Sequence, residues 1–237
     1  MNVRIFRVIL ISIGLLLPTG GRAQYIIEAL PRWIVSVHGN YMLPQPPGDV
    51  FMSPDDWGYQ FEFQYRLQYN RPFLAGAYFS EAVLSAYSLE YIMYDPDLVT
   101  EVKNKAKTSR IEAGFTAGFY PEINWLLQPY LQGRVGMAWF KTTEKIRDTE
   151  EYEILDKTKV MTNNVLSYGI DLGIHIVPNI WYVRGDLRVG FVANPSVTYM
   201  TLDEESAGTT DYPISYFQTH TSACKWLKIS MGVSYLF

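Results

Sequence analysis

One pair of residues in this sequence has the side chains of a catalytic nucleophile and its base. His220-Thr221-Ser222 places an imidazole two residues before a hydroxyl. Such a pair needs a third group, usually a carboxylate, to orient the imidazole. No Asp or Glu follows Asp211, so no acid lies downstream of the pair. We therefore predict that the match is a chance one and that the chain is not an enzyme.

A set of charged residues instead falls on one face of an alternating pattern. From Trp57 to Asn70 the odd positions are aromatic or leucine, and the even positions are polar or glycine. A period of two over this length indicates a β-strand, because a helix would scatter these residues around its axis. The same alternation recurs in 33–42, 111–120, 127–140, 166–176, 181–191 and 226–237. An eighth strand fits 73–80, where both faces hold apolar residues and the pattern does not assign the inward face.

The connections between these strands alternate between short and long. Short turns are expected at 69–72, 120–124 and 177–180, and long polar loops at roughly 43–56, 81–107, 142–163 and 194–222. Transmembrane β-barrels have this pattern, with tight periplasmic turns, long extracellular loops and an even strand number. Aromatic residues fall at both expected membrane interfaces: Trp33, Tyr69, Trp125, Trp181 and Tyr235 at the turn side, and Tyr41, Trp57 and Trp139 at the loop side.

The first residues have the features of a secretory signal peptide. Arg4 and Arg7 precede a short apolar run, and Gly21-Arg22-Ala23 offers small residues before a cleavage site. The run is about half of the ~20 apolar residues that cross a bilayer as a helix. We predict cleavage after Ala23, which leaves 24–237 as one barrel domain. The cut removes three arginines and no acid, so the net charge falls from −4 to −7. An acidic chain without a basic patch in its sequence argues against a nucleic-acid partner.

Alternation by itself fits two architectures with opposite faces inward. A soluble sandwich or lipocalin-like barrel would bury the aromatic face, whereas a membrane barrel would turn it to lipid. The glycines favour the membrane barrel, because they lie on the polar face: Gly114, Gly118, Gly136, Gly169, Gly173, Gly190 and Gly232. A narrow eight-stranded interior needs small residues beside its charged ones. The predicted fold is all-β, an eight-stranded antiparallel up-and-down transmembrane β-barrel.

On this prediction the barrel interior holds a network of opposite charges. Its members are Glu62, Arg66, Arg110, Glu112, Arg134, Asp171, Arg184, Asp186, Arg188 and Lys228. Four acids facing six bases can pair, which matters because a buried charge without a partner is costly. We predict that the network is structural and fills the barrel. The alternative is a narrow polar pore, which the bulk of Tyr130, Tyr182 and Trp226 disfavours.

The histidines do not suggest a metal site. His38 is expected at mid-height of the barrel, His175 near the turn side and His220 in a loop, heights that the rise of a strand keeps apart. Cys224 is the only cysteine, and no zinc-type spacing or EF-hand loop is present. We predict no metal and no cofactor.

The carboxyl terminus carries a family resemblance. The last ten residues alternate and end on a phenylalanine, and with Tyr235 and Phe237 they look like the closing signal that the barrel-assembly machinery reads. Residues 128–140 are similar to the fifth strand of small OmpA/OmpX-like barrels of Gram-negative bacteria. The resemblance covers 24–237. It implies location in the cell outer membrane, with outer-membrane lipid and lipopolysaccharide around the barrel. One type of outer-membrane barrel acts on lipid A through a His-x-Ser pair and a nearby acid; the acid downstream of that pair is absent here.

These observations lead to a function stated by class. We expect a non-enzymatic outer-membrane barrel that supports envelope integrity or binds a protein partner through its extracellular loops. An accessory subunit of a secretion or transport assembly is the alternative, and a lipid-A-modifying enzyme comes third. Loop 142–163 is strongly charged and is expected to be a solvated hairpin tip. Asp203-Glu204-Glu205, in the last loop, can meet divalent cations that bridge lipopolysaccharide.

Overall fold

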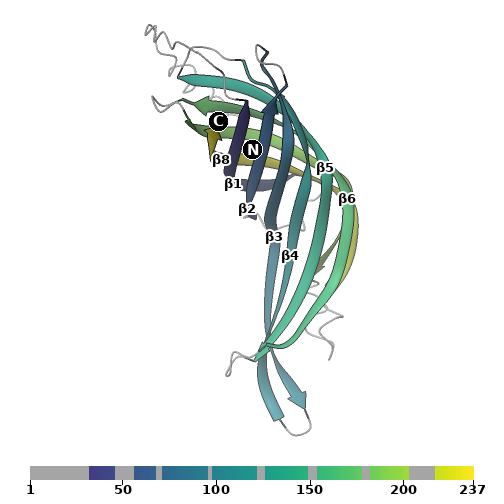
Figure 1. Ribbon diagram of the computed structural model, residues 1–237. Helices are drawn as coiled ribbons and strands as arrows, with labels where there is room; N and C mark the ends of the chain where they lie inside the picture. Colours follow the sequence, from purple (N-terminus) through teal and green to yellow (C-terminus); the bar gives the residue numbers. More distant parts are fainter. Residues whose placement is uncertain are drawn as a thin grey trace, which may run out of the picture.

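The architecture is a closed antiparallel barrel. The computed structural model describes residues 32–45, 56–67, 71–95, 98–121, 126–148, 154–177, 182–202 and 217–237. Within them eight strands follow one another around the barrel in chain order, and the last strand pairs with the first (Figure 1). This confirms the predicted eight-stranded up-and-down barrel. Among the described residues there is no helix long and apolar enough to cross a membrane.

The strands differ in length along the chain. They are β1 (Trp33–Gln45), β2 (Asp56–Arg66), β3 (Phe73–Asp95), β4 (Leu98–Phe119), β5 (Leu127–Asp148), β6 (Ile154–Ile176), β7 (Val183–Leu202) and β8 (Phe217–Leu236). The first two have 13 and 11 residues, whereas β3 to β8 have 20 to 23. One side of the barrel is therefore low and the rest extends well beyond it.

The three long loops predicted at 81–107, 142–163 and 194–222 are mostly strand, so those boundaries were wrong. The β3–β4 hairpin remains paired as far as Asp95 and Leu98, and β5–β6 as far as Arg147 and Ile154. The alternation of apolar residues fades where these strands extend, because a paired strand outside lipid has no need of an apolar outer face. Loss of the pattern marks the limit of the apolar band and not the limit of the strand.

The two ends of the barrel are built differently. The end with the short connections, here called the turn end, also holds the start of β1 and the end of β8, where Trp33 and Phe237 exchange main-chain hydrogen bonds of 2.9 and 3.0 Å. The opposite end, the loop end, is where β3 to β8 extend (Figure 1). The placement of both termini of the barrel at the turn end follows from the even number of strands.

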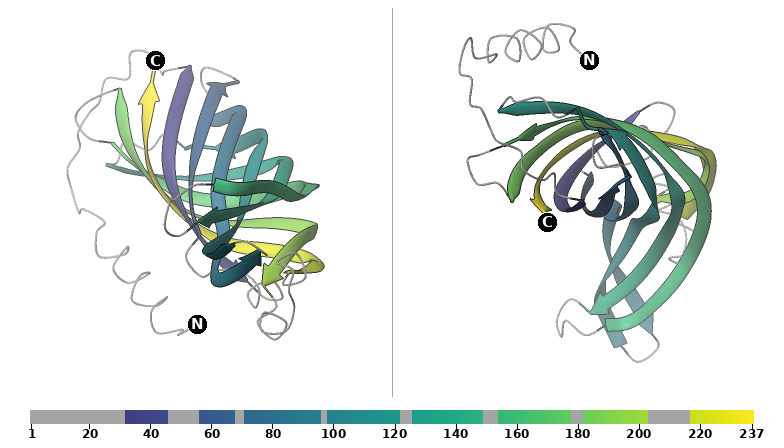
Figure 2. Two further views of the ribbon diagram at one scale, coloured as in Figure 1. Left: turned by 90° about the horizontal axis from the view of Figure 1, so that it is seen from below. Right: turned by 45° about the horizontal axis from the view of Figure 1, so that its top comes forward.

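At the loop end the barrel divides into two sheets. In the described residues β6 and β7 pair only from Tyr168 with Ala193 down to Ile176 with Gly185. Beyond that point β6 continues on β5, and β7 continues on β8 (Figure 2). Pro195 follows the last paired residues of β7, and a bulge lies between Asn194 and Val197. Proline has no N–H to donate to a ladder, so the β6–β7 pairing ends there.

Side-chain exposure alternates along the strands, with large apolar residues outside. On β2, Glu62 is 2% exposed and the adjacent Phe63 is 46% exposed. On β3, for which the sequence pattern assigned no inward face, Leu74 and Tyr78 are buried, and Phe73 and Phe79 lie outside. The polar face is thus inside and the aromatic face outside.

Candidate functional site in the barrel interior

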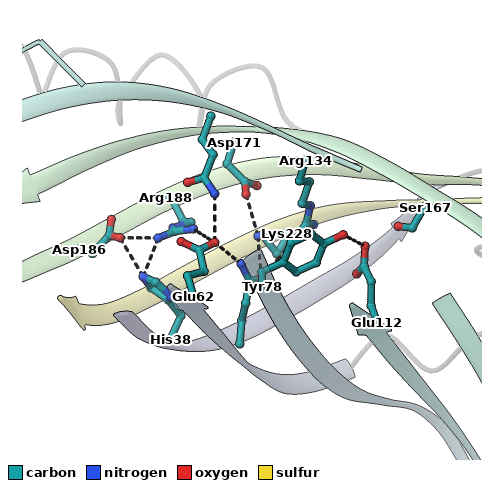
Figure 3. A network of polar contacts seen from close by, with 12 residues as sticks. His38, Glu62, Tyr78, Glu112, Arg134, Ser167, Asp171, Asp186, Arg188 and Lys228 are labelled. Carbon is teal, nitrogen blue, oxygen red and sulfur yellow. Dashed lines mark hydrogen bonds and ion pairs between the residues drawn. The ribbon is translucent and has the colours of Figure 1, made fainter. Parts of the chain in front are cut away.

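The polar side chains of all eight strands meet in the middle of the barrel (Figure 3). One centre of this network is the guanidinium of Arg188. Its Nη1 donates to Oε1 of Glu62 at 2.8 Å, and its Nη2 donates to Oδ2 of Asp186 at 2.5 Å. Tyr130 donates its hydroxyl to Oδ1 of Asp186 at 2.7 Å. These contacts join β2, β5 and β7 across the interior.

Two histidines lie against the same carboxylate. Nε2 of His38 is 2.8 Å from Oδ2 of Asp186, and Nε2 of His175 is 3.7 Å from it. The expectation that His38 and His175 sit at different heights was wrong. The register explains why: His38 pairs with Gly232, Gly232 with Asp186, and Asp186 with His175, which forms one row across four strands. Strands in a barrel are tilted and staggered, so position along a strand does not give height.

A second group surrounds Lys228. Its Nζ donates to Oδ2 of Asp171 at 3.0 Å and to Oε1 of Gln60 at 3.2 Å. Arg134 donates to the same Gln60 oxygen at 3.1 Å. The Gln60 amide nitrogen in turn donates to Oε1 of Glu62 at 2.5 Å, so this group is continuous with the first.

Gly190 makes the Lys228–Asp171 contact possible. It lies between the two residues in the register, paired with Lys228 on β8 and Asp171 on β6. A Cβ atom on Gly190 would lie 1.6 Å from Oδ1 of Asp171. A glycine is therefore required for the two side chains to meet across β7.

A third group lies nearer the loop end. Nη2 of Arg110 is 2.6 Å from Oε2 of Glu112 and donates to Ser167 at 3.0 Å. Tyr78 donates to Oε1 of Glu112 at 2.6 Å. The guanidinium of Arg110 also lies 5.3 Å from the ring centre of Trp226, within the range of a cation–π contact.

The predicted lumen residues thus separate into two sets. Four acids and four bases make up the interior network: Glu62, Glu112, Asp171 and Asp186 with Arg110, Arg134, Arg188 and Lys228. The Arg110–Glu112 group meets the rest through Arg134, whose guanidinium lies 5.7 Å from the ring centre of Tyr78. The other two predicted bases, Arg66 and Arg184, lie toward the turn end and line a small pocket there with Tyr120, Tyr130 and His175. Sequence analysis did not single out Gln60, Tyr78 and Gln132, the neutral residues that join the charged groups.

Apolar side chains close the interior on both sides of the network. Toward the turn end the cluster is Ile34, Leu74, Tyr120, Tyr130 and Leu236. Toward the loop end it is Met42, Ala82, Leu84, Ala138, Phe140, Val165, Val197, Tyr199, Cys224 and Trp226. Tyr182, which was expected to fill the lumen, is instead 61% exposed beside β7. The bulk inside comes from Trp226 and Phe140, both 1% exposed or less.

The residues proposed for chemistry elsewhere lie apart from this network. The Ser222 hydroxyl is 3.3 Å from the hydroxyl of Tyr199 and 3.9 Å from the Cys224 sulfur. His220 pairs with Tyr199 in the β7–β8 ladder, and its side chain lies outside the described residues, as does Asp203-Glu204-Glu205. In the part of the chain that the structure describes, no three His, Cys, Asp or Glu residues are grouped to hold a metal ion.

The outer face of the barrel is apolar on every strand. Phe115 is 73% exposed, Met231 69% and Leu172 62%, on β4, β8 and β6. A water-soluble barrel has the reverse arrangement, because so large a continuous apolar surface is not stable in water. The chain is a transmembrane β-barrel. Tyr235 and Phe237, the residues of the predicted assembly signal, lie on this outer face and are 51% and 54% exposed.

Solved structures of bacterial surface barrels have a similar arrangement. A major outer membrane protein from Thermus thermophilus matches with a TM-score of 0.48 and 13% identity, over 86% of this chain and 99% of that one. Neisserial surface protein A gives a TM-score of 0.45 and 10% identity, over 86% and 97%. Ail, the attachment invasion locus protein of Yersinia pestis, gives 0.41 and 12%, over 88% and 99%. No family model and no curated protein sequence matches the chain.

Proposed function

We propose that this protein is a non-enzymatic barrel of the bacterial outer membrane, in which the charge network closes the barrel and the loop end carries the function. The observation behind the proposal is the filled interior. Among the described residues, a balanced set of buried acids and bases lies between two apolar clusters, and together these side chains fill the barrel at mid-height. The network is then a structural plug.

The loop end provides the surface that a partner can contact. The paired strands of β3 to β6 extend beyond the low rim formed by β1 and β2 (Figure 1). We propose that this extension faces the cell exterior and supports envelope integrity or binds a partner. Export with cleavage after Ala23, delivery by the barrel-assembly machinery and contact with lipopolysaccharide belong to the same proposal.

A second candidate is an accessory subunit of a secretion or transport assembly. The specific observation for it is that β6 above Tyr168 and β7 above Ala193 have no described partner on their facing edges. Such edges can accept a strand from another protein. Crosslinking from a residue near this edge, such as Leu166→Cys, would capture that protein if it is present.

Conductance and mobility measurements test the proposed plug. The full-length protein is purified from outer membranes, run on a gel with and without boiling, and placed in a planar lipid bilayer. We expect a heat-dependent change in mobility, which indicates a closed barrel, and no steady conductance. A double variant, Glu62→Ala with Arg188→Ala, removes the central pair together and is expected to admit ions. Steady conductance of the unaltered protein would contradict the plug, and recovery from the periplasm without a mobility change would contradict the membrane location.

Genetic complementation tests the role of the loop end. Cells that lack the protein are expected to become sensitive to detergent, and the intact chain to restore resistance. A variant with a shortened β3–β4 hairpin keeps the barrel and is expected not to restore it. Restoration by the shortened variant would move the function from the extension to the barrel itself.

A further inference from the structure

The outer face of the β3–β6 extension carries a basic surface that the linear sequence does not reveal. The pairing register brings basic residues of three strands onto one side of the sheet. They are Lys103, Lys105 and Lys107 on β4, Lys141, Lys145 and Arg147 on β5, and Lys157 and Lys159 on β6. This set is called the basic face below. In the sequence the same residues are spread over 103–159 and alternate with acids, so no basic patch was expected.

The acids interleaved with these residues largely leave this side of the sheet. Glu144 lies on β5 between outward positions, is 6% exposed, and accepts a hydrogen bond from Asn104 on the inner side. On the outer side, Glu90 pairs with Lys103, and Glu101 is exposed near the hairpin tip. Within the described residues the outer side therefore has a clear excess of positive charge.

The centre of the basic face is a row of three lysines. Lys105 pairs directly with Lys145, and Lys145 pairs directly with Lys157. Lys103 and Arg147 form another like-charged pair one pleat further along. Like charges directly opposite one another destabilise a sheet. An anion beside such a row is therefore expected to stabilise the sheet.

The basic face begins where the apolar band ends. Trp139 is the last aromatic residue on the outer side of β5, and Lys141 is the next residue on that side. At about 3.3 Å of rise per residue, Lys141 lies about 7 Å along the strand from Trp139 and Lys145 about 20 Å. Strand tilt reduces these to somewhat smaller heights. The basic face thus begins in the layer in which lipid headgroups lie, which is about 5–8 Å deep on each side of the bilayer, and continues beyond it.

The opposite wall of the barrel has no comparable charge. On β7 and β8 the outward residues at the same end include Ser196, Thr198, Thr219 and Thr221, with Lys225 as the one basic residue in the described part of that wall. Thr198 and Thr221 contact one another through their hydroxyls at 3.1 Å. The positive charge is therefore confined to one side and is not a general property of the loop end.

We propose that the basic face binds the phosphate groups of the lipids that surround the barrel in the outer leaflet. The inference rests on the proposed outer-membrane location and names the chemistry that the extension would meet there. Phosphate groups spaced along a lipid surface match a row of ammonium groups by charge, without a requirement for a fitted pocket. Binding on one side would also fix the orientation of the extension relative to the membrane.

A binding measurement with defined lipids tests the proposal. The purified full-length protein is titrated with mixed micelles of diphosphoryl lipid A, and separately with monophosphoryl lipid A and with inorganic phosphate. We expect tighter binding of the diphosphoryl form and only weak competition by inorganic phosphate. Lys105→Gln with Lys145→Gln and Lys157→Gln should weaken binding by about tenfold or more. The same three positions changed to Arg should bind within a few-fold of the unaltered protein, and Lys225→Gln should bind as the unaltered protein does.

The outcomes separate this inference from the proposed function. If the triple Gln variant binds lipid A as well as the unaltered protein while both keep a heat-dependent mobility, the basic face is not the binding surface and the barrel proposal is unaffected. Inorganic phosphate that competes as well as lipid A, at equal phosphate concentration, would overturn the assignment to lipid. Loss of the mobility change in the unaltered protein would instead count against the barrel proposal.

A second measurement has a predicted sign. Without lipid and at low salt, Lys145→Gln should raise the temperature at which the barrel unfolds, because it removes the middle charge of the row. The difference should disappear at about 1 M salt, where charges are screened within about 3 Å. A lower unfolding temperature for Lys145→Gln would overturn the proposal. It would mean that acids of the chain itself, for example Glu150, Glu151 and Glu153, already neutralise the row.

Discussion

The part of the barrel between the turn end and the last β6–β7 pairs, called the lower barrel, is built differently from the loop end. From the turn end up to Tyr168 on β6 and Ala193 on β7, every strand is paired on both sides, and the interior is filled. Above that level β3 to β6 form a four-stranded sheet, and β7 and β8 form a two-stranded ribbon with separate edges. In lipid, unpaired main-chain groups are costly, so the ladder must be closed there. In water the requirement is relaxed, and the two sheets can separate.

The charged side chains of the lower barrel and of the loop end differ as well. In the lower barrel the charges of the network are buried and balanced, and each acid of the network has a basic neighbour. At the loop end the charges lie outside and one sign predominates on the basic face. The lower barrel is therefore expected to determine stability, and the loop end to determine what the protein contacts.

The largest effect is expected at glycines that face inward across paired strands. A Cβ on Gly136 would lie 2.3 Å from the main-chain oxygen of Ala113 and 2.8 Å from the Cα of Gly114. We expect Gly136→Val to prevent assembly of the barrel, because the main chain of β4 cannot move without opening the ladder. The measurement is the amount of heat-modifiable protein in the outer membrane. Gly133→Val is the control on the same strand: Gly133 faces outward, with its nearest atom, the oxygen of Ala117, 3.8 Å away. Equal assembly of the two variants would show that the interior is less tightly packed than the structure indicates.

Removal of one charge from the network should cost less but remain severe. Asp186→Ala leaves Arg188, His38 and Tyr130 without a shared carboxylate. We expect a loss of about 3–5 kcal/mol in the free energy of unfolding, the usual cost of breaking a buried ion pair. Urea titration of the folded band on an unboiled gel measures it. Lys103→Ala, which breaks the exposed pair with Glu90 at the loop end, is the matched comparison and should cost about 1 kcal/mol or less. Similar losses for the two variants would remove the distinction between buried and exposed charge.

Much of this division could be predicted from the sequence, and the reason lies in the period of two. Trp57 to Arg66 assigns each side chain of β2 to lipid or lumen without any knowledge of its neighbours, and the structure agrees. The pattern did not assign β3, since Leu74 and Phe79 are both apolar although one lies inside and the other outside. The long loops were predicted where strands continue, because β-pairing outside lipid leaves no apolar alternation to read.

The contacts of the interior were beyond sequence reasoning. The list of lumen charges follows from alternation, but which charges meet depends on register and stagger. His38 and Asp186 are 148 positions apart, and their contact depends on how β8 closes on β1 and pairs with β7. The same is true of the basic face, which exists only because Lys105, Lys145 and Lys157 share one row. Alternation assigns each residue to a face, whereas the residue that lies opposite it depends on turn geometry and on the stagger of the closed barrel.

The point where the two regions meet offers a smaller, local test. Asn194 lies at the last level of β6–β7 pairing, and its side-chain nitrogen donates to the main-chain oxygen of Leu166 at 2.9 Å. This bond satisfies a carbonyl that has no partner strand beyond it. We expect Asn194→Ala to cost about 1 kcal/mol and to increase amide hydrogen exchange above Tyr168 on β6, with no change near Asp171. Increased exchange along the whole of β6 would show that the point where β6 and β7 separate unfolds together with the lower barrel.

The smallest effect on stability is expected from removal of a large part of the loop end. In the β3–β4 hairpin Ala86 pairs with Lys107. A two-residue Asn-Gly turn can replace all the residues between Ala86 and Lys107. The lower barrel keeps both neighbours of every strand in this variant, so its unfolding in urea should change by about 0.5 kcal/mol or less. Because Lys103 and Lys105 are removed, lipid A binding should weaken even though the barrel remains closed. If shortening the hairpin instead destabilises the barrel by several kcal/mol, the extension is part of the folding unit. Stability and contact with the outside would then not be separable in this protein.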